Sequence, residues 1–120
     1  MSGSLTTHVL DIVLGRPAEN MRIELWQLDL AGTGRTHVIT VRTNHDGRVD
    51  EPLLHGDTFA AGAYELIFDV GEYFAMQALD LVSPPFLGHV PVRFSVADPN
   101  AHYHVPLLVS PWAYSTYRGS

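Results

Sequence analysis

The sequence predicts an all-β sandwich of seven to eight strands with one short helix. Three observations lead to this fold class. Several short stretches are rich in β-branched, aliphatic and aromatic residues, and some of them alternate apolar and polar positions. Turn signals made of Gly, Pro, Asn and Asp separate these stretches. Seven or eight strands at this spacing within 120 residues are typical of two packed sheets.

The first half of the chain contains three clear strand signals and a weaker one. A run of Val, Leu, Ile and Thr follows the N-terminus and stops at a Gly-Arg-Pro turn. In the next run Met21, Ile23 and Leu25 share one face. The third run is β-branched and stops at Asn-His-Asp-Gly, a turn signal. We predict strands over residues 5–14, 21–28, 36–43 and, weakly, 49–54.

The second half continues the pattern and holds the helix. The clearest alternation places Val90, Val92, Phe94 and Val96 on one face. An Asp-Pro-Asn turn and a Ser-Pro pair separate the last strands. A stretch of Gly, Glu, Tyr, Phe, Ala, Met and Gln is the only helical candidate. We predict strands over residues 64–68, 90–96, 102–109 and 112–117, and the helix over residues 71–79.

Length and charge narrow the class of protein. A chain of 120 residues predicts a single domain, residues 5–120, after a flexible N-terminus or cloning remnant at residues 1–4. The net charge of −6 argues against a nucleic-acid partner, which needs clustered Lys and Arg. No apolar run approaches the roughly 20 residues of a membrane span, and no secretory signal is visible. We therefore expect a cytoplasmic protein without membrane contact.

Two residue types are missing from the chain. Without Cys there is no disulfide, thiolate nucleophile or Cys-ligated zinc, and without Lys there is no Schiff-base mechanism. The side chains left for chemistry are His, Asp, Glu, Ser, Thr, Tyr and Arg. Seven His are available, and His titrates nearest to neutral pH.

A His-x-His pair lies on one of the last strands. His102 and His104 share a face with Pro106 and Leu108, while the alternate residues face the core. A face that is half apolar and half imidazole suits a ligand pocket or a subunit interface. The pair alone fits three readings: residues without chemistry, two ligands of a His₃ zinc site, or acid–base catalysis on water with an Arg as charge stabiliser.

Two further residues have little meaning alone. His8 shares its strand parity with aliphatic residues, which is typical of a structural His. Arg48 follows an Asp-Gly turn, where an Arg is ordinarily solvated, and His45 in that turn is expected to be exposed. Neither a Gly-rich phosphate loop nor a Gly-x-Ser-x-Gly elbow occurs.

Taken together, these motifs resemble one family. "TTHVLD", "TNHDGR", "HYHVPLL" and "YSTYRGS" follow one another in the order seen in the 5-hydroxyisourate hydrolases, also called transthyretin-related proteins. The resemblance extends from about Leu5 to Ser120, and the terminal Tyr-Arg-Gly-Ser is its most specific signal. It implies a transthyretin-like sandwich whose subunits pair through their last strands, with two such dimers stacked into a homotetramer.

The resemblance also implies an activity. Family members hydrolyse 5-hydroxyisourate to 2-oxo-4-hydroxy-4-carboxy-5-ureidoimidazoline in urate catabolism, without a metal or organic cofactor. Sites lie in the channel between dimers. The motifs assign catalytic positions to His8, Arg48, His104 and Ser120. They assign substrate contacts to His8, Arg48, Tyr117 and His102.

These residues support a hydrolytic mechanism. His104, oriented by His8, would take a proton from water, and Arg48 would stabilise the developing negative charge. Ser120 and the terminal carboxylate would position the imidazole or the substrate, and Tyr117 would contact the ring. Two alternatives remain at this point: a transthyretin-like carrier of small ligands without hydrolase activity, and a His-based zinc-binding protein.

Overall fold

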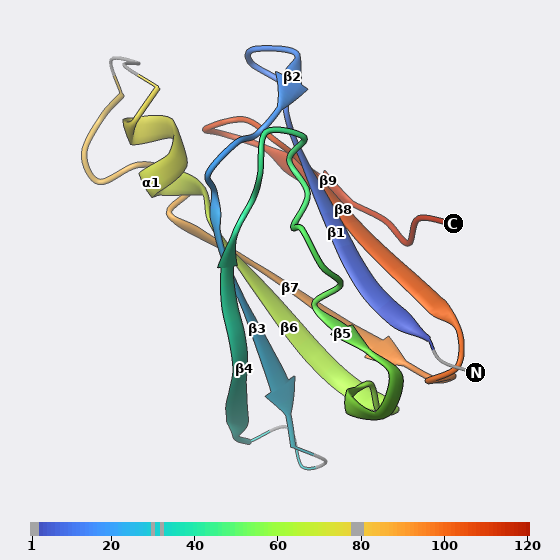
Figure 1. The fold of residues 1–120 in the computed structure, drawn as a ribbon. Helices are drawn as coiled ribbons and strands as arrows, with labels where there is room; N and C mark the ends of the chain where they lie inside the picture. The colour runs from blue at the N-terminus through green and yellow to red at the C-terminus, as the bar shows by residue number, and fades with distance from the viewer. Residues whose placement is uncertain (1–2, 30, 32, 78–80) are drawn as a thin grey trace.

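The computed structural model of the chain describes residues 3–29, 31, 33–77 and 81–120, and these form two facing sheets with one short helix (Figure 1). One sheet has the order β4 (Arg35–Arg42), β3 (Arg22–Leu28), β6 (Gly62–Asp69), β7 (His89–Val96). The other has the order β2 (Arg16–Pro17), β1 (Ser4–Asp11), β8 (His102–Val109), β9 (Tyr114–Thr116), with β5 (Leu54–His55) also paired to β1. The helix is α1 (Val70–Ala75), and η1 (Gly56–Thr58) is a 3₁₀ turn.

The predicted sandwich is confirmed, and the described residues contain nine strands because three very short ones add to the long ones. The core lies where the predicted alternation places it. Met21, Ile23 and Leu25 are fully buried, as are the inward residues of β6. On β8 the inward positions Val105 and Leu107 are buried as well. No helix within the described ranges is long and apolar enough to cross a membrane.

The first strand begins earlier and ends earlier than predicted. Ser4, in the segment expected to be flexible, is already part of β1, while residues 1 and 2 lie outside the described residues. The C-terminal part of the prediction is wrong because Asp11 ends the strand. Its carboxylate accepts hydrogen bonds from the backbone N–H groups of Val13 (2.8 Å) and Leu14 (3.0 Å), which turn the chain away from the sheet.

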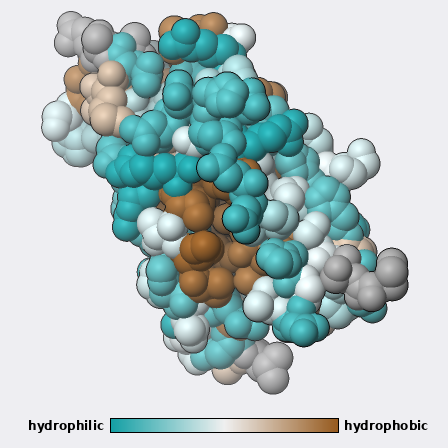
Figure 2. All heavy atoms as spheres, viewed as in Figure 1, coloured by the Kyte–Doolittle hydropathy of each residue, from teal (hydrophilic) through white to brown (hydrophobic). Residues whose placement is uncertain are grey.

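The segment after β4 passes from one sheet to the other instead of forming a hairpin. In Figure 1 it is the green stretch that crosses near β2 and then descends to β5. The weak strand predicted over residues 49–54 is therefore wrong except for Leu54, which pairs with Leu5. Between β4 and this segment lies a hollow of about 730 Å³ whose apolar lining residues contribute to the brown patch in Figure 2, and Arg42, Asp50 and Glu51 are among its polar lining residues.

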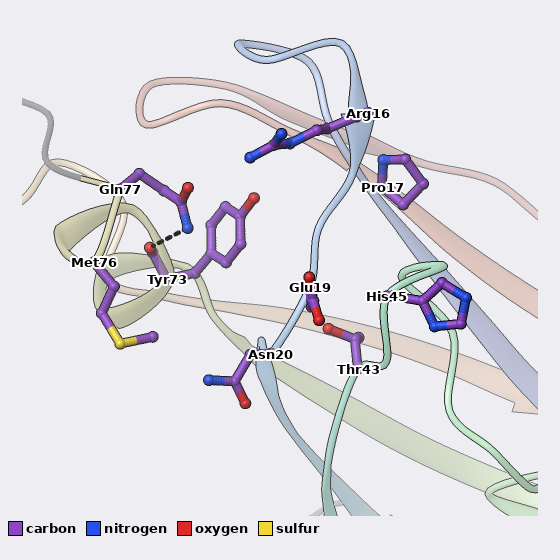
Figure 3. Close-up of a pocket in the computed structure, with 9 residues that line it drawn as sticks. All are labelled: Arg16, Pro17, Glu19, Asn20, Thr43, His45, Tyr73, Met76 and Gln77. Carbon is purple, nitrogen blue, oxygen red and sulfur yellow. Dashed lines mark hydrogen bonds between the residues drawn. The ribbon is translucent and has the colours of Figure 1, made fainter.

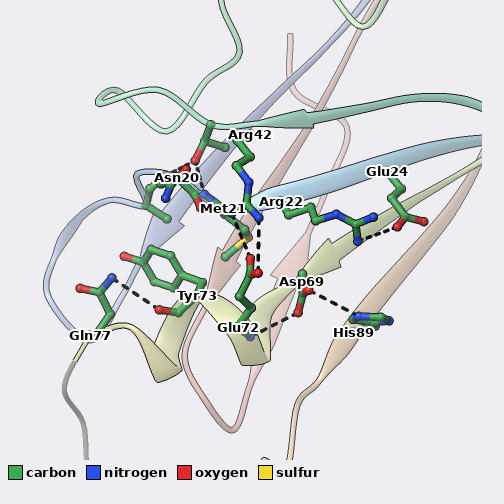
Figure 4. Close-up of polar contacts among 12 residues, drawn as sticks. Asn20, Met21, Arg22, Glu24, Arg42, Asp69, Glu72, Tyr73, Gln77 and His89 are labelled. Carbon is green, nitrogen blue, oxygen red and sulfur yellow. Dashed lines mark hydrogen bonds and ion pairs between the residues drawn. The ribbon is translucent and has the colours of Figure 1, made fainter.

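The helix is capped and tied to both sheets. Its N-cap Asp69 accepts a hydrogen bond from the backbone N–H of Glu72, and the Glu72 carboxylate pairs with Arg42 of β4 at 3.0 Å (Figure 4). The buried Tyr73 hydroxyl donates to Asp11 at 2.7 Å. The predicted helix is confirmed over residues 71–75 and begins one residue earlier, at Val70. The prediction is wrong at Met76 and Gln77, which form a turn, and its last two positions, 78 and 79, lie outside the described residues.

β1 and β8 run side by side and parallel, although they are about a hundred residues apart in the chain (Figure 1). Thr6 lies opposite His104, and His8 lies opposite Pro106. Because side chains alternate along each strand, these four residues share one face of the sheet. Since their partners at the alternate positions fill the core, this His-bearing face points away from the interior of the sandwich.

Candidate active site

The parallel pairing of β1 and β8 brings three predicted residues onto one outer face. His8 is a diagonal neighbour of His104, and His102 lies two residues before His104 on the same strand. The rings of His102 and His104 have centroids 6.3 Å apart. The Thr6 hydroxyl lies between them, 2.9 Å from His102 Nε2 and 2.8 Å from His104 Nδ1. One hydroxyl therefore links His102 and His104, and His8 lies beside them on the same face. We call these three side chains the imidazole cluster.

The Asn-His-Asp-Gly turn places Arg48 next to this cluster. The Asn44 side-chain oxygen accepts from the backbone N–H groups of Asp46 (2.9 Å) and Arg48 (3.2 Å), which closes the turn. The Val9 N–H then donates to the Gly47 carbonyl at 2.8 Å. Gly47 has φ +74°, and a Cβ there would collide with the Val9 carbonyl. The turn is thus fastened to β1 one residue beyond His8.

The electrostatics of the site favour neutral imidazoles. Burial, followed by the positive charge of Arg48, lowers the pKa of His8 below the ordinary value of 6.5. Hydrogen bonding to the Asp46 backbone and the Asp46 charge oppose this shift. Burial and then Arg48 also lower the pKa of His104, with smaller contributions from the two neighbouring imidazoles. A neutral imidazole beside a fixed cation can accept a proton near pH 7.

His8 carries an unsatisfied polar atom. Its Nε2 is buried and finds no hydrogen-bond partner among the described residues. A buried polar atom without a partner costs about 1–3 kcal/mol, so it is rarely retained without a reason. The atom belongs to an imidazole with a lowered pKa on the face that holds the predicted site.

The C-terminal tail folds back onto His104. The Gly119 N–H donates to the His104 carbonyl at 2.7 Å, and a Cβ at Gly119 would lie 2.6 Å from His104 Cδ2. Glycine is therefore the residue that lets the tail approach the ring, and Ser120 follows directly. The Arg118 guanidinium lies 4.1 Å from the centre of the Tyr103 ring and donates to the His102 carbonyl at 3.3 Å. These contacts hold the tail in place.

The predicted residues thus differ in their placement. His8, Arg48, His102 and His104 come together, and Ser120 is next to a residue paired with His104. Tyr117 does not join them within one chain. It is 61% exposed and lines a hollow of about 320 Å³ between β7 and the tail, together with core-facing residues of β8.

The zinc interpretation gains no support from the geometry. Within the part of the chain that the structure describes, no three His, Asp or Glu side chains are grouped so that they could hold a metal ion. One nitrogen of each ring, His102 Nε2 and His104 Nδ1, faces the Thr6 hydroxyl at 2.9 and 2.8 Å.

Two large hollows among the described residues lie away from the imidazole cluster. One of about 690 Å³ lies behind the turn, between α1 and β2, and is lined by polar residues that include Arg16, Glu19 and His45 (Figure 3). His45 is exposed, as predicted. The imidazole cluster itself lies on an open sheet face, which becomes an enclosed site only if something covers it.

Sequence reasoning missed Thr6 and Arg118. Thr6 has a signal in "TTHVLD", because it lies two residues before His8 and so shares its face. Its contact with His102 and His104 depends on the pairing of β1 with β8, which spacing within one strand does not reveal. Arg118 has no such signal. Its partner Tyr103 lies on β8 and faces the core, so their contact depends on how the tail folds back.

The chain matches the sequence model of the HIUase/Transthyretin family over residues 5–119. It is 56% identical to the 5-hydroxyisourate hydrolase 2 of Rhizobium meliloti (strain 1021) over 119 residues, which cover 99% of this chain and 98% of the relative. The match therefore extends over nearly the full length of both proteins.

Solved structures agree with this comparison. The crystal structure of an (S)-allantoin synthase matches with a TM-score of 0.92 and 49% identity over 99% of this chain, which spans only 44% of that longer chain. Sea bream transthyretin in complex with thyroxine matches with a TM-score of 0.83 and 32% identity, covering 97% of this chain and 94% of the other. Sequence and fold agree over the whole domain, and the chain belongs to the HIUase/Transthyretin family.

Proposed function

We propose that the protein hydrolyses 5-hydroxyisourate to 2-oxo-4-hydroxy-4-carboxy-5-ureidoimidazoline. The observation that carries this proposal is the pair His8 and His104, both with lowered pKa, beside the cation Arg48 on one sheet face. The identity of 56% with a 5-hydroxyisourate hydrolase, over 99% of this chain and 98% of the relative, supports the same substrate. The lower identity of 32% with a thyroxine-bound transthyretin makes the carrier function the weaker alternative.

The residues account for each step of an amide hydrolysis. His104 takes a proton from water through Nε2 while the water oxygen bonds to the ring carbonyl carbon. Arg48 donates hydrogen bonds to the carbonyl oxygen, which gains the negative charge. The ring C–N bond then breaks as His104 returns its proton to the leaving nitrogen. We assign His8 to contacts with the substrate or the water, and Ser120, which follows Gly119 beside His104, to orienting the same group.

The proposal is tested by following the ultraviolet decay of 5-hydroxyisourate freshly made by urate oxidase. We expect the protein to accelerate this decay well above the spontaneous rate, and chelator treatment to leave the acceleration unchanged. Spontaneous decay alone, combined with tight binding of thyroxine, would instead identify a carrier.

The same assay can measure how kcat/KM depends on pH, for which the structure gives a prediction. Catalysis needs neutral imidazoles, and burial and Arg48 lower the pKa of both His8 and His104 below 6.5. Activity is therefore retained through the ordinary titration range of imidazole and falls only at lower pH. We expect kcat/KM to be flat near pH 7, with the midpoint of its acid limb below 6.5. A midpoint at or above 6.5 contradicts the proposed role of these imidazoles.

We also propose that the active form is a homotetramer in which a second subunit covers the imidazole face. Leu10 and Leu108 pair on this face next to the imidazole cluster. Large apolar side chains are also exposed in the segments that follow β1 and β8. They have exposed fractions of 43–62% and are Ile12, Val13, Leu14 and Trp112. An exposed apolar patch of this kind is typical of an interface. The open face needs such a cover to exclude water from the reaction.

Sedimentation velocity tests this assembly. We expect a species with the mass of four 13.3 kDa chains, and we expect Trp112→Glu to dissociate it into smaller species with lower activity. Met76→Glu is the matched control, because Met76, the C-cap residue of α1, is a similarly exposed apolar residue. A monomer with full activity contradicts the covered site.

A further inference from the structure

We propose that Thr6 is a positioning residue that holds His104 in the tautomer required of a general base, through a hydrogen-bonded chain from His104 through Thr6 to His102. The inference rests on the proposed function of His104 and adds a residue to it. It follows from two short contacts made by one hydroxyl: 2.8 Å to His104 Nδ1 and 2.9 Å to His102 Nε2.

The chain of contacts is built into the sheet. Thr6 lies directly opposite His104 in the parallel β1–β8 pairing, and Ser4 lies opposite His102. Thr6 is therefore the residue of β1 that can reach both imidazoles from one side. Threonine is branched at Cβ, so its χ1 is restricted and its hydroxyl has few other positions. Both contacts lie within the distance range of good hydrogen bonds.

The number of protons on the Thr6 hydroxyl and the two imidazoles limits how they can hydrogen-bond to one another. A hydroxyl has one proton, and a neutral imidazole has one N–H and one acceptor nitrogen. Thr6 can therefore donate to only one of its two partners, and the other must donate to it. If His104 Nδ1–H donates to Thr6, the Thr6 proton goes to His102 Nε2, and His104 Nε2 keeps its lone pair. If the Thr6 hydroxyl donates to His104 Nδ1 instead, His104 carries its proton on Nε2 and cannot act as a base at that atom.

The first direction also fits the catalytic cycle. When His104 accepts a proton on Nε2 it becomes a cation, and its Nδ1–H still donates to Thr6. That hydrogen bond becomes stronger because its donor is now charged. No ring rotation or proton rearrangement is needed between the two states. Thr6 thus does for this imidazole what the Asp of a Ser-His-Asp triad does by orientation, but without a negative charge.

The neutral partner matters because it leaves the electrostatics of His104 intact. A carboxylate at this place would stabilise the imidazolium and raise the pKa of His104, whereas burial and Arg48 keep it low. A hydroxyl orients the ring without opposing this effect. The site therefore obtains a fixed tautomer and a weakly basic, neutral imidazole at once.

The test compares Thr6→Val, which keeps the shape and removes the hydroxyl, with Thr6→Ser, which keeps the hydroxyl. We expect Thr6→Val to lower kcat by roughly 10²-fold, at the lower end of what acid–base catalysis contributes, with little change in KM. We expect Thr6→Ser to retain kcat within a few-fold. Thr40→Val is the matched control, because Thr40 makes a similar 2.7 Å contact with His37 Nε2 on the other sheet.

The second readout is the tautomer itself, measured by ¹H–¹⁵N correlation spectra of histidine-labelled protein at pH 7.5. We expect His104 to carry its proton on Nδ1 in the wild type and in Thr6→Ser, and to shift towards Nε2–H in Thr6→Val. A wild-type His104 protonated on Nε2 overturns the proposal, as does a Thr6→Val variant with unchanged kcat. Equal loss in Thr6→Ser and Thr6→Val overturns it too, since that outcome indicates packing.

The two readouts separate this inference from the function on which it rests. If the wild type does not hydrolyse 5-hydroxyisourate, the proposed function fails, but the spectra still decide whether Thr6 sets the His104 tautomer. If the wild type is active and the spectra of wild type and Thr6→Val are identical, only the role of Thr6 fails. Circular dichroism of each variant confirms that the compared proteins are folded.

Discussion

Arg48→Gln is expected to lower kcat/KM for 5-hydroxyisourate by about 10²–10³-fold. Arg48 is the cation that acts on both His8 and His104, and its planar fork suits a carbonyl oxygen that becomes negatively charged. Glutamine keeps hydrogen-bonding capacity but removes the charge. Steady-state kinetics with freshly made substrate measure the effect, and the fall should appear mainly in kcat.

Arg48→Gln is also expected to change the pH profile of the activity. The positive charge of Arg48 is one of the causes that lower the pKa of His8 and His104, so its removal raises both values. The acid limb of the pH profile should therefore move to higher pH in Arg48→Gln. Arg42→Gln is the control, because Arg42 is also exposed but pairs with Glu72 of the helix. Equal losses in both variants contradict a specific role for Arg48.

His104→Gln is expected to lower kcat by about 10²–10⁴-fold, the range that a general base contributes. Glutamine keeps a polar side chain near Thr6 and the tail but cannot accept and return a proton. Single-turnover and steady-state kinetics measure the loss, and circular dichroism checks that β8 still pairs with β1. The residual rate should lose the acid limb that belongs to the imidazole.

His45→Gln is the matched control for this experiment. His45 is exposed in the turn that carries Arg48, and its ring lies 3.5 Å from the neighbouring Asp46 carboxylate. Its replacement should leave kcat unchanged.

His8→Gln shows which imidazole is the general base. A large loss of kcat in His8→Gln combined with a small loss in His104→Gln would assign the general base to His8, since both imidazoles have a lowered pKa beside Arg48.

Much of the fold was predictable because two-residue alternation survives wherever a strand has one buried face. The three valines of the apolar face of 90–96 and the inward residues of 102–109 are buried in the structure, and Phe94 is half-buried. The misses have local causes. The carboxylate of Asp11 ends β1 early, and the run over 49–54 crosses between the sheets because the preceding turn is fastened to Val9. The strand propensities of individual residues do not reveal such contacts between distant segments.

The motifs predicted that His8, Arg48, His102 and His104 lie near one another, but not the contacts that link them to other segments. The motifs around His8, Arg48 and His104 point to family positions, and their neighbourhood on one face supports that assignment. The Thr6 hydroxyl, the close approach of Gly119 to the His104 ring and the stacking of Arg118 on Tyr103 needed the structure. Each joins residues from different strands or from the tail.

The sequence by itself determined the class of fold, the strand faces and the kinds of chemistry available: no thiol, no amine, and imidazoles beside a guanidinium. Those properties depend on residue identity and short-range periodicity. Only the tertiary structure decided that Thr6 meets His104 across 98 positions, that Arg48 lies beside His8, and that the imidazole face is open within one chain. Such contacts depend on which strands pair and in which register, and that choice is made by packing the whole core at once.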